Sequence, residues 1–269
     1  MALVDFHMHS SLSDGALSPQ QLLSMIRARG LAAWAITDHD TLAASVTLAA
    51  EAGWVSGVEL TCWAEGHEIH MVGLGMDPEA PLLSALLTAV QAARRAYLSR
   101  LCRYLREDCG LTEVHNQAGE QAGSLIASRS HLANFLVGQR LVTHHSAAFT
   151  RWLGDEALAG KVAAPDYPDL ASGAAAIRAA GGLSILAHPA HYRDYSLVER
   201  WLASGHFDGV ETDHPRIDGG WRAFLKSCAT RRGLLESCGS DFHFPGKRRL
   251  GDHCHRSAYL APLLNRLRA

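Results

Sequence analysis

Seven short apolar segments, most of them separated by helical stretches, constrain the fold of this chain more than any other sequence feature. Each segment is rich in β-forming residues and is bounded by turn residues, which is typical of buried strands. Strands that alternate with helices usually pair in parallel, so the pattern predicts an α/β architecture. The predicted strands are Leu3–His7, Ala32–Thr37, Trp54–Leu60, His67–Leu74, Leu183–His188, Phe207–Thr212 and Leu234–Ser240.

Three helices between these strands have recognisable ends. Ser18 followed by Pro19 is a typical helix start, because the hydroxyl caps the first turn and proline suits its first position. Gly30 is placed to end that helix. Two further helices are predicted over Asp169–Ala180 and Trp221–Arg232.

The alternation of strands and helices is interrupted between Pro81 and Pro165. This stretch begins with a long helical run over Leu82–Arg106 and continues with shorter helical pieces at His131–Val137 and Ala147–Leu153. We interpret residues 81–165 as a helical insertion that serves as a substrate lid. Residues 1–80 and 166–269 then form one discontinuous unit.

The composition excludes several classes of protein. The 269 residues carry 25 basic and 27 acidic side chains, which gives no basic face for a nucleic-acid duplex but allows a small anionic ligand held by a few arginines. The N-terminus resembles no export signal, and the longest apolar runs, such as Leu82–Val90, are too short to span a membrane. Six cysteines without a C-x-x-C pair indicate a reducing, cytoplasmic setting.

The sixteen histidines are the anomaly of the composition, because histidine is the commonest metal ligand in proteins. Many of them lie at strand ends together with carboxylates. In a parallel barrel these ends converge on one face, where such barrels place their chemistry. The candidate ligands that would meet there are His7, His9, Asp14, His39, Glu59, His70, His188, Asp241 and His243.

Each candidate ligand also has an ordinary structural explanation. A single histidine such as His70 is often only a hydrogen-bonded structural residue. The run Thr37-Asp38-His39-Asp40 can be a polar turn, and Glu59 can be a buried ion-pair partner. The joint pattern favours a metal site, because the candidates recur at the ends of successive strands.

These residues resemble the motifs of the PHP family, named for polymerase and histidinol phosphatase. Its members hydrolyse phosphoesters with a cluster of divalent metals held by a distorted seven-stranded (β/α) barrel. The matching motifs are His7-Met8-His9-Ser10 with Asp14-Gly15, Ile36-Thr37-Asp38-His39-Asp40, Gly57-Val58-Glu59, His70, Ala187-His188-Pro189 and Ser240-Asp241-Phe242-His243.

The resemblance implies a PHP-type barrel with a helical insertion, and it implies that the nine candidates are the metal ligands. Glu59, Asp241 and His188 would be catalytic, with Glu59 and Asp241 bridging metals. About three ions would bind, each needing several ligands and open positions for water. Manganese is the expected metal, and iron, zinc and magnesium are alternatives.

Within the family, the chain is similar to a branch of bacterial nucleoside 3′,5′-bisphosphate phosphatases and enzymes that trim the 5′ ends of short RNAs. The features that carry this likeness are Ser128–Leu132, Gly209-Val210-Glu211 and Gly239–His243. The expected reaction is hydrolysis of the 3′-phosphate of a nucleoside 3′,5′-bisphosphate. Exonucleolytic cleavage of short RNA is the alternative. The loop Phe244–Arg249 does not match this branch.

Three residues outside the ligand set are candidates for substrate binding. Arg129 can grip a phosphate bidentately through its guanidinium group, although it can also be a solvated arginine at a helix start. His131 and His214 can orient the substrate or protonate the leaving oxygen, or be ordinary surface histidines. The run Lys247, Arg248 and Arg249 can attract a phosphate but is more typical of a solvated loop.

Two other functions remain open from the sequence. A metal-dependent amidohydrolase also begins with His-x-His on a barrel strand, but it usually carries a carboxylated lysine as the bridging ligand. The chain's lysines, Lys161, Lys226 and Lys247, lie on no predicted strand. A non-catalytic metal-stabilised scaffold would be expected to lose ligands, yet all nine candidates are present.

Overall fold

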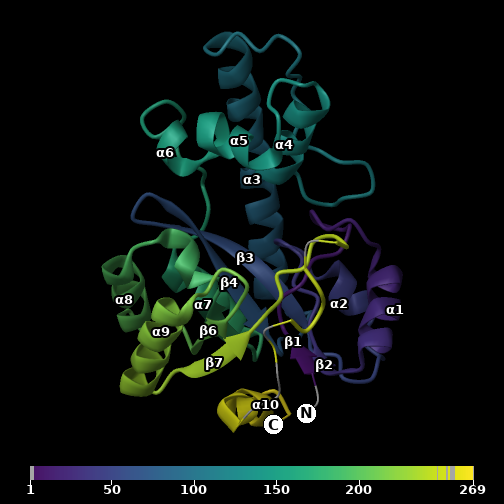
Figure 1. The fold of residues 1–269 in the computed structure, drawn as a ribbon, viewed down its shortest axis with the longest axis vertical. Helices are drawn as coiled ribbons and strands as arrows, with labels where there is room; N and C mark the ends of the chain where they lie inside the picture. The colour runs from purple at the N-terminus through teal and green to yellow at the C-terminus, as the bar shows by residue number, and fades with distance from the viewer. Residues whose placement is uncertain (1–2, 247, 253, 255–257, 269) are drawn as a thin grey trace.

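The computed structural model describes residues 3–246, 248–252, 254 and 258–268. Each of the seven predicted strands has a counterpart in it, and helices lie between most of them (Figure 1). The α/β class is therefore confirmed. The strands are β1 (Leu3–Asp5), β2 (Leu31–Trp34), β3 (Gly57–Ala64), β4 (His67–Leu74), β5 (Leu183–Leu186), β6 (Gly209–Asp213) and β7 (Leu235–Cys238).

The strands form two sheets and are not all parallel. β1 and β2 make a parallel pair, and the second sheet has the order β3-β4-β5-β6-β7. β5, β6 and β7 are parallel, but β4 runs antiparallel to both β3 and β5. The prediction of parallel pairing is wrong for β4, because Glu65 and Gly66 join it directly to β3. Both residues have positive φ angles, 50° and 85°, as a two-residue hairpin turn requires.

The strand ladders do not close into one seven-stranded barrel, but backbone hydrogen bonds beyond the strand ends link the two sheets. On one side the amide of Asp241, after β7, donates to the carbonyl of His7, after β1, at 2.8 Å. On the other side the amide of Glu59 on β3 donates to the carbonyl of Asp38, after β2, at 3.2 Å. These links bring the polar segments after β1, β2 and β7 against β3.

The helices around the strands begin and end where their sequences indicate. Ser18 caps α1 and forms a reciprocal capping box with Gln21, and Gly30 ends the helix in the left-handed region at φ 67°. Asp169 caps α7 by accepting from the amide of Ser172. The helices are α1 (Pro19–Arg29), α2 (Ala43–Thr47), α7 (Leu170–Ala179), α8 (Tyr195–Ala203), α9 (Gly219–Arg232) and α10 (Ala261–Arg266), with 3₁₀ turns at Pro189–Tyr192 and Ala258–Leu260.

The segment between β4 and α7 is helical, and one long helix connects it to the strands. α3 (Pro81–Glu107) runs from beside the sheet to the far end of the molecule, where α4 (Arg129–Gly138), α5 (His145–Ala148), a π-helical turn (Phe149–Leu153) and α6 (Asp155–Leu158) surround it (Figure 1). The first half of α3 contributes Leu83 and Leu87 to the main core. Its second half packs Leu101 and Leu105 into a separate apolar cluster with α4. The segment thus has a core of its own and is fixed to the strands through α3.

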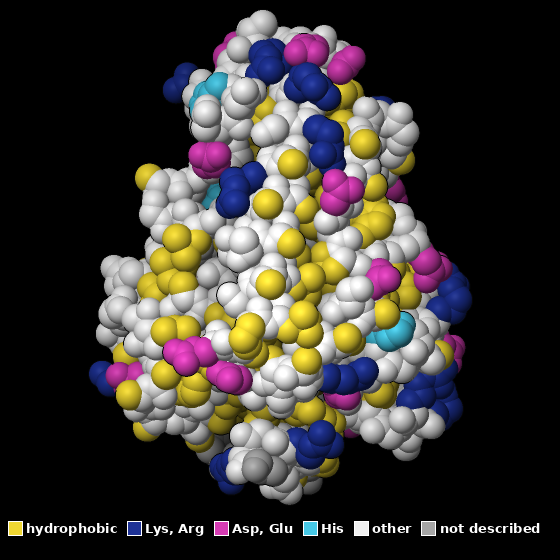
Figure 2. All heavy atoms as spheres, turned by 180° about the vertical axis from the view of Figure 1, so that it is seen from behind, with side chains coloured by type: hydrophobic (Ala, Val, Ile, Leu, Met, Phe, Trp, Pro, Cys, Tyr) yellow, Lys and Arg dark blue, Asp and Glu magenta, His cyan; other side chains and the backbone are white. Residues whose placement is uncertain are grey.

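The surface seen in Figure 2 intersperses arginine and lysine with acidic side chains instead of gathering them into one large basic patch. Among the helices of the described residues, none is long and apolar enough to cross a membrane.

Candidate metal centre

The nine predicted ligands lie together, and Glu59 occupies their centre. Its side chain is 1% exposed, and its two oxygens face different histidines. Oε1 lies within 3.3 Å of nitrogens of His7, His70 and His188. Oε2 lies 3.2 Å from His9 Nε2 and 3.1 Å from His39 Nδ1. A carboxylate whose two oxygens serve two groups of imidazoles has the arrangement expected of a bridging ligand.

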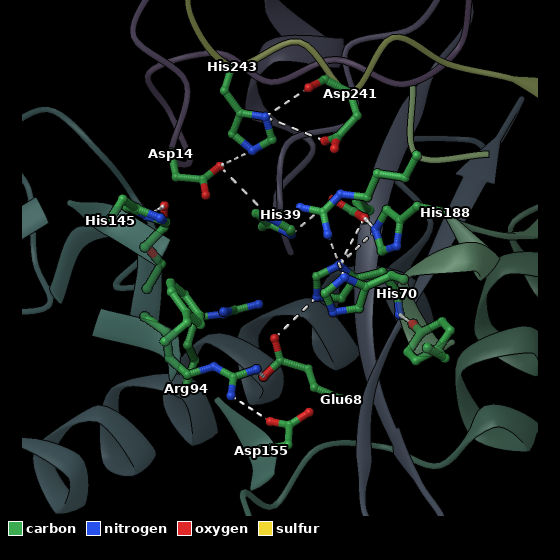
Figure 3. Close-up of a pocket in the computed structure, with 18 residues that line it drawn as sticks. Asp14, His39, Glu68, His70, Arg94, His145, Asp155, His188, Asp241 and His243 are labelled. Carbon is green, nitrogen blue, oxygen red and sulfur yellow. Dashed lines mark hydrogen bonds and ion pairs between the residues drawn. The ribbon is translucent and has the colours of Figure 1, made fainter. Parts of the chain in front are cut away.

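Asp14, Asp241 and His243 complete the cluster on its other side (Figure 3). Asp14 Oδ1 is 3.3 Å from His243 Nε2 and 3.7 Å from His39 Nε2. Asp241 Oδ1 is 3.4 Å from His243 Nδ1 and 3.5 Å from His9 Nε2. These short distances join the segments after β1, β2 and β7 into one site.

Strand geometry explains why residues so distant in sequence meet. His7 and His9 are two residues apart in extended chain, so their side chains leave the same face. His70 pairs with Thr61 across the β3–β4 hairpin, which places it on the same face as Glu59. His70 therefore reaches the site from the fourth predicted strand, which runs antiparallel to its neighbours.

The backbone after β7 is unusually tight. Gly239 is packed so closely that an added Cβ would lie 2.1 Å from His7 Cβ and 2.8 Å from Glu211 Oε1. Asp241 and His188 have positive φ angles of 48° and 30°. Such conformations are costly for residues with side chains and concentrate at functional sites.

Two buried carboxylates form a second layer that orients the candidate ligands. Glu211 on β6 makes a 2.8 Å hydrogen bond with His7 Nδ1 and accepts from the backbone amide of His188 at 2.5 Å. Asp38 accepts from the amide and hydroxyl of Ser10 and from the hydroxyl of Ser13, which fixes the loop that carries Asp14. Outer partners of this kind set the ring orientation of metal-binding histidines. The sequence analysis named both residues only as members of motifs and did not predict that they orient the ligands.

The electrostatics of the site stabilise ionised carboxylates. Burial raises the pKa of a carboxyl group, but the charges of neighbouring histidines hold the pKa values of Glu59, Asp14 and Asp241 well below their usual range. Burial lowers the pKa of His9, yet the carboxylates of Asp241 and Glu59 raise it to about 10. Burial lowers the pKa of His188 to about 4. The buried carboxylates are thus held in the ionised form in which a carboxylate binds a metal.

The donor set fits divalent metals. Three overlapping groups have ligand atoms within 4.8 Å of one another: His9, Asp14, His39 and His243; His7, His9 and Glu59; and His39, Glu59 and His70. Among the described residues, several of their buried atoms make no hydrogen bond: His7 Nε2, both nitrogens of His9, His39 Nδ1 and Asp14 Oδ1. Buried polar atoms without partners are costly unless something else binds them. Mixed imidazole and carboxylate donors suit manganese, iron or zinc.

The cluster forms one wall of a cavity of about 220 Å³. The helical segment provides a second wall, and the loops after β5 and β6 provide a third. Figure 3 shows Glu68 next to His70, with its Oε1 3.2 Å from His70 Nε2, and Asp155 beyond it. The lining residues outside the cluster are Glu68, Arg94, Ser128, Arg129, Ser130, His145, Phe149, Asp155, His191, Tyr192 and Arg216.

Arg129 lines this cavity at the first position of α4, but it already has acidic partners. Its Nη1 is 2.6 Å from Asp155 Oδ1 and donates to the carbonyl of Leu153 at 3.0 Å. Its Nη2 is 3.1 Å from Glu68 Oε2. It is therefore a well-positioned, partly buried arginine and not a solvated one.

The two candidate histidines lie elsewhere. His131 is buried on α4 and borders a separate hollow with His115 and Phe135, not the cavity lined by Arg129. His214 is fully buried behind the cluster, with Nε2 3.4 Å from Asp241 Oδ2. His214 is thus placed to orient a ligand, and neither ring faces the cavity.

The basic loop after β7 and the lysines also have defined places. Arg248 donates to the carbonyl of Asp241 at 2.6 Å and to its Oδ2 at 2.5 Å, while Arg249 is exposed. Lys247 lies outside the described residues. Lys226, on the outer helix α9, pairs with Glu236 on β7, and Lys161, which follows α6, donates to the carbonyl of Ala157 within that helix. An amidohydrolase of this kind would be expected to have a lysine in the cluster, and neither described lysine lies there.

A buried group of histidines and carboxylates at a cavity has the donors of a metal site, and comparison with known proteins identifies the family of the chain. The model of the PHP domain matches residues 5–115. A 5′-3′ exoribonuclease of Haemophilus influenzae is 33% identical over 90% of each chain. A 3′,5′-nucleoside bisphosphate phosphatase of Chromobacterium violaceum is 33% identical over 92% of this chain and 89% of its own. A solved structure from Chromobacterium violaceum, described as an amidohydrolase with bound sulfate and no metal, superimposes with a TM-score of 0.85 at 28% identity, covering 99% of this chain and 96% of that one.

The chain belongs to the PHP family. It is a metal-dependent phosphoesterase.

Proposed function

We propose that this enzyme hydrolyses a phosphomonoester of a small nucleotide, and that its substrate is a nucleoside 3′,5′-bisphosphate that loses its 3′-phosphate. The observation that carries the proposal is the layout of the cavity. The cluster forms one wall, and Arg129 with Ser128 and Ser130 at the start of α4 lies on another. A cavity with two places for anions suits a nucleotide with two phosphates. The Chromobacterium relative named as a bisphosphate phosphatase supports this choice.

The nine clustered residues would hold about three divalent ions, with manganese the expected metal. When bound, such ions lower the pKa of a water and offset the charge of phosphoryl oxygens. The chain's own contribution is to hold the ligands in place: Glu59 between two groups of imidazoles, and Glu211 and His214 behind His7 and Asp241.

We assign residues 81–165 the role of a lid. Their helices carry Arg129 and Asp155 to the cavity, while the first half of α3 is anchored in the main core. Covers of this type exclude water and hold the part of the substrate that does not react.

A second candidate activity is removal of nucleotides from the 5′ ends of short RNAs. The Haemophilus relative named as an exoribonuclease favours it. The near balance of 25 basic and 27 acidic side chains suits short substrates better than duplexes.

The test compares kcat/KM of the manganese-loaded enzyme for a nucleoside 3′,5′-bisphosphate, the matching 3′-monophosphate and a short 5′-phosphorylated RNA. The bisphosphate should be preferred. Arg129→Ala should erode the preference over the monophosphate about 10- to 100-fold, as expected for one charged hydrogen-bonding partner. Arg103→Ala, which removes an exposed arginine of α3, is the control. A loss that is equal on both nucleotides would refute the two-phosphate proposal, and faster RNA cleavage would favour the second activity.

A further inference from the structure

Three arginines line the cavity, and two of them form ion pairs with carboxylates of the protein. Arg94 Nη2 pairs with the buried carboxylate of Asp40 at 2.5 Å. Arg129 is shared between Glu68 and Asp155. Arg216, in the loop after β6, forms no ion pair with a carboxylate in the part of the chain that the structure describes. Its charge is therefore available to an anionic ligand.

The partner of Arg216 is a histidine, and this contact has a definite polarity. Arg216 Nη1 lies 2.7 Å from His191 Nδ1. Because a guanidinium group only donates, His191 Nδ1 accepts and the ring carries its proton on Nε2. The His191 ring is 5.7 Å from the ring of His188, measured between centroids. The pair thus lies at the edge of the cluster, and both residues are exposed at the cavity.

We propose that Arg216, held in position by His191, binds the oxygens of the phosphoryl group that is hydrolysed. This inference rests on the proposed phosphoesterase function. A guanidinium group can contact two phosphoryl oxygens at once. Arg216 contacts His191, whose ring lies 5.7 Å from that of His188, and this position assigns Arg216 to the phosphate at the cluster. Arg129, on α4, is assigned to the second phosphate.

The first measurement is calorimetric titration of the manganese-loaded protein with inorganic phosphate. Arg216→Met should weaken phosphate binding about 10- to 100-fold, the effect of one charged hydrogen-bonding partner. Arg216→Lys keeps the charge but loses the planar group that can contact two oxygens, so its phosphate affinity should lie between those of the wild type and Arg216→Met. Arg193→Met is the matched control, because Arg193 is an exposed arginine of the neighbouring loop that does not line the cavity. Bound metal and melting temperature, measured for each variant, should equal those of the wild type.

The second measurement separates Arg216 from Arg129 and from a general structural effect. Arg216→Met should lower kcat/KM by the same factor for the bisphosphate and the 3′-monophosphate, whereas Arg129→Ala should affect mainly the bisphosphate. His191→Gln keeps an acceptor for Arg216 and should stay closer to wild type than His191→Ala.

Wild-type phosphate affinity in Arg216→Met, with hydrolysis by the wild type intact, would overturn the inference and leave the proposed function standing. A wild-type enzyme that hydrolyses no phosphate ester would instead contradict the proposed function.

Discussion

Replacing Glu211 by glutamine should weaken metal binding while the protein stays folded. Glu211 does not touch the cavity, yet its two oxygens contact His7 Nδ1 and the backbone amide of His188. Glutamine keeps one of these acceptors and puts an NH₂ group in the place of the other. One of the two contacts is then lost, and the new NH₂ group faces either the Nδ1–H of His7 or the backbone N–H of His188, which is also a donor. Water cannot relieve this conflict, because residue 211 is only 1% exposed.

The size of the effect follows from what the contact does. An acceptor at His7 Nδ1 keeps the ring proton there and leaves Nε2, 3.3 Å from Glu59 Oε1, free to bind a metal. Without it the ring can protonate at Nε2 or rotate. Loss of such an outer partner typically costs 10- to 100-fold in metal affinity, which is about 1.4–2.7 kcal/mol.

The assay is titration of chelator-treated protein with Mn²⁺, followed by calorimetry, with a melting curve for each variant. Glu236→Gln is the control, because Glu236 is also a paired carboxylate but contacts Thr212 and Lys226 away from the cluster. Equal Mn²⁺ affinity in Glu211→Gln and wild type would refute the idea that Glu211 orients a ligand.

Four further substitutions test other parts of the site. Glu59→Gln and Asp241→Asn should each remove most activity with little change in fold, since neither side chain belongs to the apolar clusters of the core; near-normal kcat under saturating metal would exclude that residue from the centre. Gly239→Ala should displace His7 and reduce the bound metal measured after reconstitution, because its Cβ would lie 2.1 Å from that of His7; full metal content would contradict this. Arg94→Met leaves the fully buried Asp40 without its ion pair and should lower the free energy of unfolding by about 3–5 kcal/mol in urea titrations; a change below about 1 kcal/mol would show that Asp40 finds another partner.

Much of the fold follows from local sequence signals. Strand positions were predicted from short apolar segments, and the limits of α1 from Ser18, Pro19 and Gly30. The direction of β4 was missed because a hairpin depends on two residues, Glu65 and Gly66, that give a much weaker signal than a crossover helix. The predicted seven-stranded barrel is not confirmed, because the strands form two separate sheets that only hydrogen bonds beyond the strand ends connect, such as that between Asp241 and His7.

The candidate ligands were found from the sequence because their residue types are rare and they recur near the ends of successive strands. The residues that act with them were not found. Glu68, His191 and Arg216 line the cavity, but each is a single polar residue with no motif around it. Their roles depend on contacts between distant segments, such as the pairing of Glu68 with Arg129. His131 shows the converse, because a place beside Arg129 in the sequence did not bring it to the same cavity.

The most direct test of the metal centre is to count bound metal and measure catalysis in the same samples. Chelator-treated protein would be titrated with Mn²⁺ while phosphate release from a nucleoside 3′,5′-bisphosphate is followed. We expect no release from the metal-free protein, and a rate that rises with bound metal until about three ions per chain are present. Release at the full rate without bound metal, or a folded protein that binds no Mn²⁺, would contradict the metal centre.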